Sequence, residues 1–202
     1  MKKRVIYLVR HGSINTGGSK RFIGQAELPL NAEGIRQAEY LQRKLAGANL
    51  TEIYCSDLSR SRQTADIIAA VHSIQLSVCS GLREISLGEW EGLSFSEIEK
   101  KYPGEFERRG ADIAGYRPPG GESFADLSTR VINEFYRILN HSSGNILLVG
   151  HAGVNRVIIC HLLGMPLKNI FKICQNYGCL NVIYQDNSSF QINLINHIEL
   201  SL

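Results

Sequence analysis

Long hydrophobic runs, blocks of one charge and paired cysteine motifs are all missing from this sequence of 202 residues. No stretch approaches the roughly 20 apolar residues that a membrane-spanning helix requires. The start, MKKRVIYLVR, is basic and then apolar, but Arg10 interrupts it too early for the core of a signal peptide. The five cysteines form an odd set without C-x-x-C, which argues against a disulfide framework and a zinc ribbon. We therefore expect a cytoplasmic protein without a membrane partner.

The charge and composition set further limits. The net charge of +3 is a mild excess, spread along the chain without a long Lys/Arg block, so a nucleic-acid surface is not expected. Small anions remain plausible partners. Hydrophobic residues at 44% and charged residues at 20% are ordinary for a globular protein, and no change in composition marks a seam. We expect one domain over residues 1–202.

Short apolar strands alternate with helical patterns along the chain. In the second half, the run NILLV at 145–149 is typical of a central strand buried on both faces. This alternation predicts an α/β fold, a three-layer αβα sandwich with a mainly parallel central sheet. Strands are expected at 5–9, 52–55, 75–78, 145–149, 179–184 and 190–195. A first helix is expected to begin at Asn31, with an apolar stripe of Ile35, Ala38, Leu41 and Leu45. A second helix is expected after an N-terminal cap at Ser56-Asp57. Further helices are expected at 94–101, 122–139 and 154–163, with an irregular loop at 115–121.

Cationic and polar side chains follow three of these strands at the point where each ends. Arg10 and His11 follow the first strand, Arg60 lies shortly after the second, and His151 follows the run NILLV. Ligands of open α/β sheets gather at the carboxyl ends of the strands, so these residues are expected to converge. Guanidinium groups bind phosphate oxygens bidentately and stay charged at any working pH. The group suits a phosphoryl dianion, whereas the remaining histidines, at 72, 141, 161 and 197, lack such a context.

Several established ways of handling phosphate do not fit the residues. The stretch at 12–19 imitates a P-loop, but Gly18 stands where the lysine is needed, and no acidic residue follows the later buried strand to hold magnesium. Cys55 and Arg60 are one residue too close for the C-x5-R cradle of a thiol phosphatase, and Ser61 occupies the required position. No D-x-D motif is present. Metal-free chemistry with a histidine nucleophile remains, and no cofactor is expected.

Such chemistry also requires a proton donor for the leaving alcohol. A carboxylic acid placed near the phosphate pocket meets that requirement. The segment from Leu82 to Gly92 offers Glu84, Glu89 and Glu91, and periodicity alone does not choose among them.

Five ordered motifs resemble the histidine phosphatase superfamily, whose members include the phosphoglycerate mutases. The similarity extends over nearly the whole chain, from about residue 4 to about residue 195, and five motifs in order are far more specific than any one of them. The resemblance implies the phosphoglycerate mutase-like form of the αβα sandwich. The motifs are V-R-H-G at 9–12, R-F-I-G-Q at 21–25 with P-L and E-G after it, Y-C-S-D-L-S-R-S-R-Q-T-A at 54–65, the segment 82–92 with G-G-E-S at 120–123, and V-G-H-A-G at 149–153.

The resemblance implies a role for each matching position. His11 corresponds to the residue that the family phosphorylates, and Glu84 lies where the family keeps its proton donor. Arg10, Arg60 and His151 correspond to the phosphate pocket. The expected activity is metal-independent hydrolysis of a small phosphomonoester through a phosphohistidine.

Other matching positions are expected around the mouth of the pocket. Gly12 and Gly24 fall in segments that line it, and Arg21 is a further substrate contact. Two positions depart from the family pattern: Ser13 replaces the usual acidic residue, and Glu27 replaces the more common aspartate. Neither departure concerns the phosphate pocket, but both concern substrate contacts or loop shape.

Within the superfamily, the segments 118–123, 163–166 and 175–181 are similar to the small bacterial phosphatases, most of all to the α-ribazole phosphatases of cobalamin biosynthesis. Long insertions typical of cofactor-dependent mutases are absent, which favours hydrolysis. A phosphoglycerate mutase and a broad-specificity sugar phosphate phosphatase remain alternatives, and a homodimer is compatible with the resemblance. A catalytically silent binding module would have lost His11 or Glu84, and both are present. The alcohol half of the substrate is expected against the loops at 13–20 and 105–117, with Arg108-Arg109 at a solvated helix end.

Overall fold

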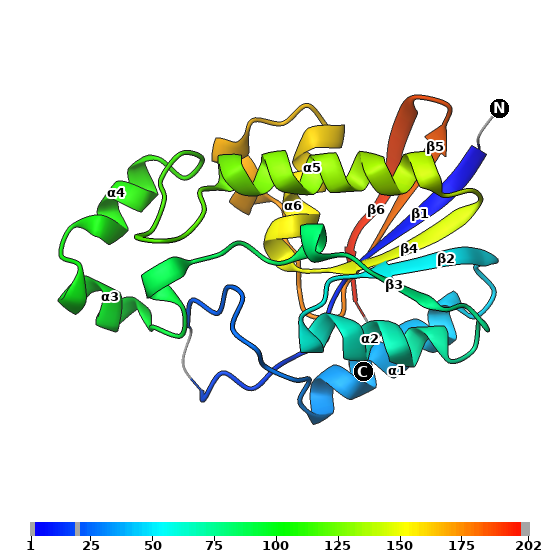
Figure 1. The fold of residues 1–202 in the computed structure, drawn as a ribbon, viewed down its shortest axis with the longest axis horizontal. Coiled ribbons are helices and arrows are strands. Elements are labelled where there is room, and N and C mark those ends of the chain that lie inside the picture. The colour runs from blue at the N-terminus through cyan, green and yellow to red at the C-terminus, as the bar shows by residue number, and fades with distance from the viewer. Residues whose placement is uncertain (1–2, 19–20, 199–202) are drawn as a thin grey trace.

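A computed structural model describes residues 3–18 and 21–198 and shows a central six-stranded sheet with strand order β3-β2-β4-β1-β5-β6 (Figure 1). Strands β3, β2, β4 and β1 are parallel, and β5 and β6 add an antiparallel hairpin next to β1. The predicted mainly parallel sheet is therefore confirmed. The strands are β1 (Lys3–Arg10), β2 (Leu50–Cys55), β3 (Leu76–Val78), β4 (Asn145–Gly150), β5 (Leu180–Asp186) and β6 (Ser189–His197).

The register of the parallel strands brings their carboxyl ends together. Arg10 of β1 pairs with Gly150 of β4, and Cys55 of β2 pairs with Val149 of β4. The residues that follow these strands are joined as well, since the Ser56 backbone N–H donates to the Val149 carbonyl at 3.2 Å. Three chain segments far apart in sequence therefore leave the sheet side by side.

Alternate residues of the central strands enter two separate cores. Ile146 and Leu148 pack with helices α5 and α6 on one face, whereas Leu147 and Val149 pack with α1 and α2 on the other. Burial on both faces accounts for the apolar residues from Ile146 to Val149, as the run NILLV predicts. Helices thus cover both faces and complete the three layers. They are α1 (Ala32–Leu45), α2 (Ser59–Ala69), α3 (Phe95–Lys101), α4 (Glu105–Ala111), α5 (Phe124–His141) and α6 (Ala152–Leu162), with short 3₁₀ turns η1 (Ser80–Leu82), η2 (Gly88–Trp90) and η3 (Leu167–Lys172).

Two details of the helix predictions are wrong. Ile35 is 43% exposed, and the buried stripe of α1 starts instead at Gly34, where the helix approaches the Ser13 backbone too closely for a larger side chain. The cap of α2 is Leu58, which offers no side-chain hydrogen bond, and not Ser56-Asp57. Ser56 instead accepts a hydrogen bond from the Leu58 backbone N–H, so it shapes the turn before the helix.

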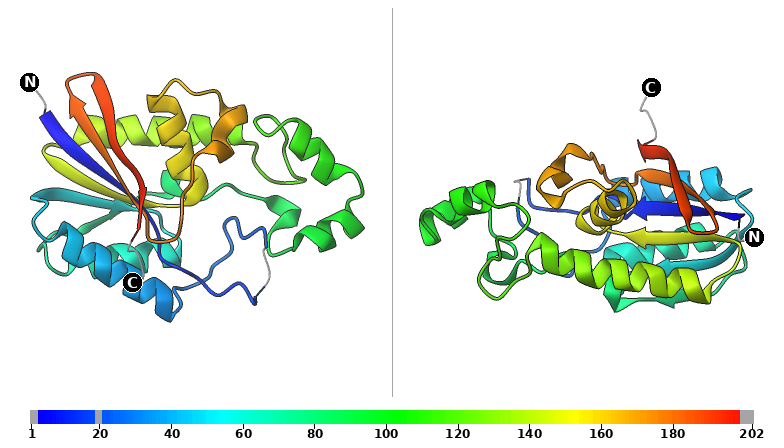
Figure 2. Two further views of the ribbon diagram at one scale, coloured as in Figure 1. Left: turned by 180° about the vertical axis from the view of Figure 1, so that it is seen from behind. Right: turned by 90° about the horizontal axis from the view of Figure 1, so that it is seen from above.

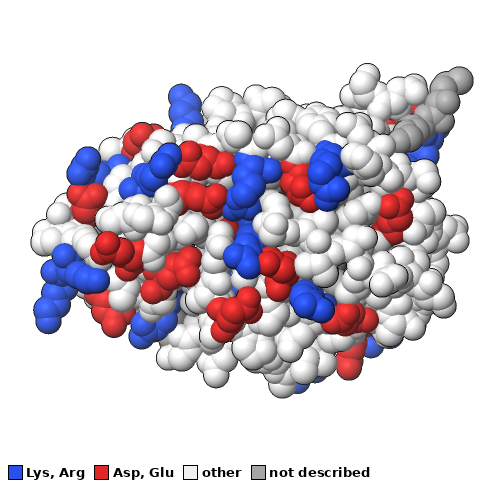
Figure 3. Space-filling view, viewed as in Figure 1, with Lys and Arg blue, Asp and Glu red and all other residues white. Residues whose placement is uncertain are grey.

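The pair α3 and α4 projects beyond the sheet at the end of the molecule away from the amino terminus (Figures 1 and 2). Helix α4 is missing from the sequence-based expectations. None of its residues is fully buried, so its sequence has no apolar stripe that would predict a helix. Figure 3 shows acidic and basic side chains interspersed among the described residues of one face. Within residues 3–18 and 21–198, no helix is both long and apolar enough to span a bilayer.

Candidate active site

His11 follows the carboxyl end of β1, an inner strand of the sheet. Its backbone N–H donates to the Gly150 carbonyl at 3.0 Å, which extends the β1–β4 pairing by one residue. The side chain is only 3% exposed. Its ring lies 5.1 Å from the ring of His151, centroid to centroid, in an edge-on arrangement. The first residues after β1 and β4 therefore meet, as the sheet topology predicts.

The two neighbours of the His11 ring define which nitrogen carries the proton. The Gly12 carbonyl, 2.7 Å from Nδ1, only accepts, so Nδ1 bears the hydrogen. The guanidinium Nε of Arg60, 3.2 Å from Nε2, only donates, so Nε2 presents its lone pair. Burial lowers the pKa of His11 well below its usual range, and the charges of Arg10 and Arg60 lower it further. These contacts and the lowered pKa favour a neutral imidazole whose Nε2 lone pair faces Arg60.

Arg60 and Arg10 bring two permanent charges to this ring. Arg60, from the first turn of α2, is 1% exposed and donates to the carbonyls of Gly24 and Ala26, both at 2.7 Å. Arg10 donates through Nη1 to the Gln175 carbonyl at 2.6 Å, and its guanidinium stacks 3.7 Å from the Tyr177 ring centroid. Its Nε is buried and has no hydrogen-bond partner among the described residues. Within residues 3–18 and 21–198, no carboxylate forms an ion pair with either guanidinium, so both are available to an anion.

His151 caps the amino end of α6 and is fully buried. Neither of its ring nitrogens has a hydrogen-bond partner in the part of the chain that the structure describes. Burial lowers its pKa well below the usual range, and His11 and Arg60 lower it further. A buried imidazole without partners is costly, so its presence beside His11 points to a ligand with polar oxygens.

Glu84 faces these groups across the cavity, and it is the only one of the three candidate acids that lines it. Its Oε2 accepts from the Gly153 backbone N–H at 3.0 Å, and its Oε1 accepts from the Ile85 N–H at 2.9 Å. Glu89 instead accepts from the Tyr102 hydroxyl, and Glu91 accepts from the backbone N–H groups of loop residues. Of the three acids, Glu84 is thus the one placed in the cavity lining.

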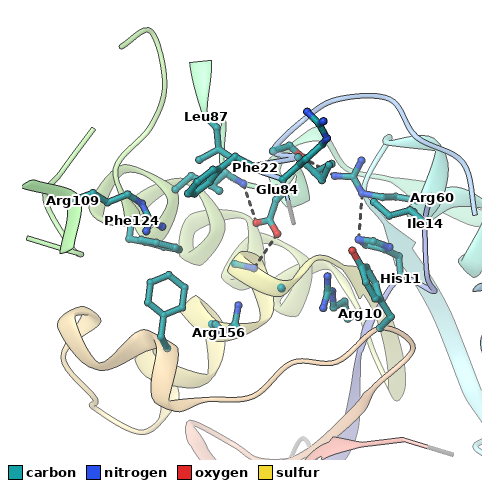
Figure 4. A pocket seen from close by; sticks show the side chains of 18 residues that line it. Arg10, His11, Ile14, Phe22, Arg60, Glu84, Leu87, Arg109, Phe124 and Arg156 are labelled. Carbon is teal, nitrogen blue, oxygen red and sulfur yellow. Dashed lines mark hydrogen bonds between the residues drawn. The ribbon is translucent and has the colours of Figure 1, made fainter. Parts of the chain in front are cut away.

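The cavity has a volume of about 250 Å³ and two chemically different ends (Figure 4). His11, Arg10 and Arg60 lie at one end, Arg109 and Phe124 lie at the other, and Glu84 lies between them. The far end is both aromatic and cationic, a combination that binds planar or anionic groups. It is lined by Phe22, Leu87, Arg109, Phe124, Arg156 and Phe171.

Three residues of the far end and the rim are missed by the sequence analysis. The expectation that Arg108-Arg109 is solvated is wrong for Arg109, which lines the cavity with its guanidinium 5.4 Å from the Phe22 ring centroid. Burial lowers the pKa of Arg109. Arg156 of α6 lies opposite, 5.5 Å from the Phe171 ring. Tyr177, 5.5 Å from the His11 ring, belongs to a segment that the sequence analysis uses only as a family motif.

The remaining expected contacts fall in different places. Gly24 and Arg21 line the cavity, and Arg21 is also bound to Glu97 and to the Gly92 carbonyl. Gly24 has φ +52°, a conformation that glycine adopts without strain. Gly12 lies behind the cavity wall, where a Cβ atom would come within 2.3 Å of the Gly34 carbonyl oxygen.

The two positions that depart from the family pattern also lie outside the cavity lining. Glu27 accepts from the Ser59 N–H at 3.0 Å and so supplies α2 with the cap that the helix lacks. Ser13 is bound to Gln37 and Asn31. Of the expected substrate loops, residues 19–20 lie outside the described part of the chain.

The described ranges also contain no group of three or more His, Cys, Asp or Glu side chains arranged to hold a metal ion. The polar groups at this edge of the sheet are instead arginine donors, imidazoles and one carboxylate.

This geometry agrees with the family that the chain matches. Residues 6–198 match the histidine phosphatase superfamily (branch 1), and the chain belongs to that family. It is therefore a phosphatase of the histidine type.

Two curated relatives and one solved structure are similar over most of their length. The chain is 28% identical over 179 residues to the adenosylcobalamin/alpha-ribazole phosphatase of Escherichia coli K12, with 88% of each chain covered. It is 32% identical over 162 residues to a probable phosphoglycerate mutase GpmB of Salmonella choleraesuis, with 80% of this chain and 75% of the relative covered. The crystal structure of a putative alpha-ribazole-5'-P phosphatase from E. coli superposes with a TM-score of 0.90 at 26% identity, covering 98% of this chain and 99% of that one.

Proposed function

We propose that the protein hydrolyses a small phosphomonoester through a phosphohistidine on His11. The observation that carries this proposal is the fixed tautomer of His11, whose Nε2 lone pair is surrounded by cationic and neutral donors. A phosphoryl group bound there would have its equatorial oxygens against Arg10, Arg60 and His151. Preorganised donors of this kind stabilise the charge on the phosphoryl group in the transition state. Holding the nucleophile in line with the leaving oxygen lowers the barrier further. No step of the cycle proposed below uses a metal ion.

In the first step His11 Nε2 attacks phosphorus, and the bond between phosphorus and the ester oxygen breaks. The departing alkoxide takes a proton from the Glu84 carboxyl group, so the alcohol leaves neutral. The Nδ1 proton of His11 stays on its hydrogen bond to the Gly12 carbonyl, which supports the positive charge that develops on the ring. The products of this step are the free alcohol, phosphohistidine and a Glu84 carboxylate.

In the second step a water molecule attacks the phosphohistidine. Glu84, now ionised, accepts the proton of that water while the bond between phosphorus and Nε2 breaks. Inorganic phosphate leaves, His11 returns to its neutral tautomer, and Glu84 is again protonated. One carboxyl group thus serves as acid and then as base, which explains why the cavity lining needs only one.

We infer that the substrate is α-ribazole 5′-phosphate. Hydrolysis of this compound is a step of cobalamin biosynthesis. The support for this substrate is the similarity to the E. coli phosphatase named for that compound, which extends over 88% of both chains. The far end of the cavity also suits a benzimidazole, because Phe22, Phe124 and Phe171 offer ring faces and edges to a flat aromatic group.

One observation favours a second candidate, a phosphoglycerate mutase. Among the described residues, neither Arg109 nor Arg156 forms an ion pair with a carboxylate. The alcohol half of α-ribazole 5′-phosphate is neutral and would leave both charges unpaired, whereas phosphoglycerate carries a carboxylate to meet them. The similarity to the probable mutase agrees with this candidate.

One set of assays tests both the chemistry and the substrate. Steady-state rates are measured with α-ribazole 5′-phosphate, 3-phosphoglycerate with its bisphosphate, and a sugar phosphate, all with EDTA present. Hydrolysis of the first at a kcat/KM at least tenfold above the others supports our assignment, whereas isotope transfer to a second phosphoester identifies a mutase. In parallel, labelled phosphate is trapped on the protein by rapid denaturation at alkaline pH, because the P–N bond of phosphohistidine is labile in acid.

Matched histidine variants decide the nucleophile. His11→Asn is expected to abolish both turnover and labelling, whereas His141→Asn, a change at an exposed residue, leaves both unchanged. Labelling that persists in His11→Asn refutes the nucleophile assignment. Glu84→Gln is expected to lower kcat by about 10²- to 10⁴-fold for an alkyl phosphate, the usual range for general acid catalysis.

A further inference from the structure

One arginine of α5 forms hydrogen bonds with the backbone of the segment that carries Glu84. Arg130 of α5 donates through Nη1 to the carbonyls of Gly81 and Arg83, both at 3.0 Å, and through Nη2 to the Glu84 carbonyl at 3.3 Å. One guanidinium thus fixes the backbone on the amino-terminal side of Glu84 and at Glu84 itself. The five donors of arginine have a rigid planar arrangement, so these bonds determine the local path of the chain.

Glu122 extends this hold to the other side of Glu84. Its carboxylate accepts two hydrogen bonds from Arg130, at 3.0 Å from Nε and 2.8 Å from Nη2. The same carboxylate accepts from the Ser86 backbone N–H at 2.9 Å, and the Glu122 N–H donates back to the Ser86 carbonyl at 2.8 Å. The pair therefore binds the chain before, at and after Glu84.

The hydrogen bonds to Glu122 favour its ionised form although the pair is largely covered. The Arg130 and Glu122 side chains are 27% and 22% exposed. Burial by itself would raise the pKa of Glu122, but the hydrogen bonds from Arg130 and from the Ser86 N–H outweigh it and lower the pKa. Such charge-assisted, two-point pairs are among the stronger hydrogen-bonded contacts of proteins.

Neither residue lines the cavity, so neither touches the substrate. Among the residues that the structure describes, the Glu84 carboxylate accepts hydrogen bonds only from the backbone N–H groups of Ile85 and Gly153, so few contacts hold it in place. We propose that Glu122 and Arg130 are positioning residues that keep the Glu84 carboxyl group within reach of the leaving oxygen. This inference rests on the proposed role of Glu84 as proton donor.

The test compares Arg130→Met with Arg137→Met, a matched control two helical turns further along α5. Arg137 also forms a two-point pair with a carboxylate, that of Glu134, but its bonds are away from Glu84. Each variant is assayed with an alkyl phosphate, whose leaving alcohol needs a proton, and with p-nitrophenyl phosphate, whose leaving group does not. For Arg130→Met we expect kcat to fall about 10- to 100-fold with the alkyl phosphate, less than for loss of the acid itself.

The dependence on leaving group separates positioning from simple destabilisation. We expect Arg130→Met to change the p-nitrophenyl phosphate rate by no more than about threefold, KM to stay within the same factor, and Arg137→Met to behave as wild type on both substrates. An equal loss on both substrates, or the same loss in Arg137→Met, would overturn the proposal. If Arg130→Met does not fold, Glu122→Gln gives the same test, because it keeps the size of the side chain and removes its charge.

The combination with Glu84→Gln distinguishes this proposal from the one on which it rests. If Arg130 acts through Glu84, the double variant Glu84→Gln/Arg130→Met is no slower than Glu84→Gln alone. If the kcat losses of the two single variants multiply in the double variant, Arg130 acts independently of Glu84 and the positioning role is refuted. If Glu84→Gln alone leaves alkyl phosphate hydrolysis unchanged, the proton-donor assignment fails instead.

Discussion

His11 and His151 are buried as neutral rings, and we expect this to make the protein lose stability steeply between pH 7.5 and pH 5.5. Burial lowers the pKa of both rings well below their ordinary value of 6.5. Below pH 6.5 the unfolded chain therefore binds two protons that the folded protein does not bind. The sign follows directly: stability is complete above the unfolded pKa and falls as the pH drops below it.

The size of the effect follows from proton linkage. For one histidine with an unfolded pKa near 6.5, protonation stabilises the unfolded state by about 1.4 kcal/mol at pH 5.5 and by about 0.1 kcal/mol at pH 7.5. Two such rings lower the free energy of unfolding by about 2.7 kcal/mol across this interval. This is a large part of the roughly 5–15 kcal/mol that stabilises a typical domain. Carboxyl groups with ordinary pKa values titrate mostly below the interval and contribute little.

Denaturant unfolding at the two pH values measures this loss, in buffers free of phosphate. The matched protein is the double variant His11→Asn/His151→Asn, in which the loss is expected to shrink by about 2.7 kcal/mol. His72, whose pKa burial also lowers, is present in both proteins and cancels in the comparison. A double variant that loses as much stability as wild type would refute the reasoning, because it would show that the folded protein protonates these rings readily.

Two further predictions concern glycines at which a Cβ atom would collide with a neighbouring residue. A Cβ atom at Gly12 would lie 2.3 Å from the Gly34 carbonyl oxygen, so Gly12→Ala is expected to lower the unfolding free energy by about 1–3 kcal/mol, as measured by urea denaturation. Gly47→Ala, with nothing within 4 Å, is the control and should not destabilise. A Cβ atom at Gly153 would lie 2.3 Å from Glu84 Oε1, so Gly153→Ala is expected to displace the carboxyl group and lower kcat for alkyl phosphates more than for aryl phosphates. Equal kinetics of Gly153→Ala and wild type on both would contradict this account.

The phosphate end of the site was predictable because its residues follow apolar strands directly. Arg10, His11 and His151 each lie within one residue of a strand end, and the order of a parallel sheet brings such ends together. Arg60 is set by the turn that begins α2. Local sequence and sheet topology were therefore sufficient for this half of the cavity.

The far end could not be predicted in the same way. The placement of Arg109 depends on how α4, a helix of seven residues without a buried side chain, stands against the aromatic rings of other segments. Similarly, the buried stripe of α1 begins at Gly34, and only the close approach of the Ser13 backbone shows why glycine is needed there. In both cases the deciding contact is between segments, and spacing along one helix does not encode it.

Helices α3 and α4 project beyond the sheet (Figure 1), and α4 carries Arg109, which lines the far end of the cavity. The groups around His11 follow strands β1 and β4, whose residues are buried in both hydrophobic cores. A change in the path of these strands would therefore disturb folding. Arg109 is delivered by an outlying helix that contributes nothing to those cores. We therefore expect replacement of residues 103–112, none of which belongs to either core, to change the preferred alcohol while leaving Glu122 and the groups around His11 in place, which makes this stretch the natural target for redesigning selectivity.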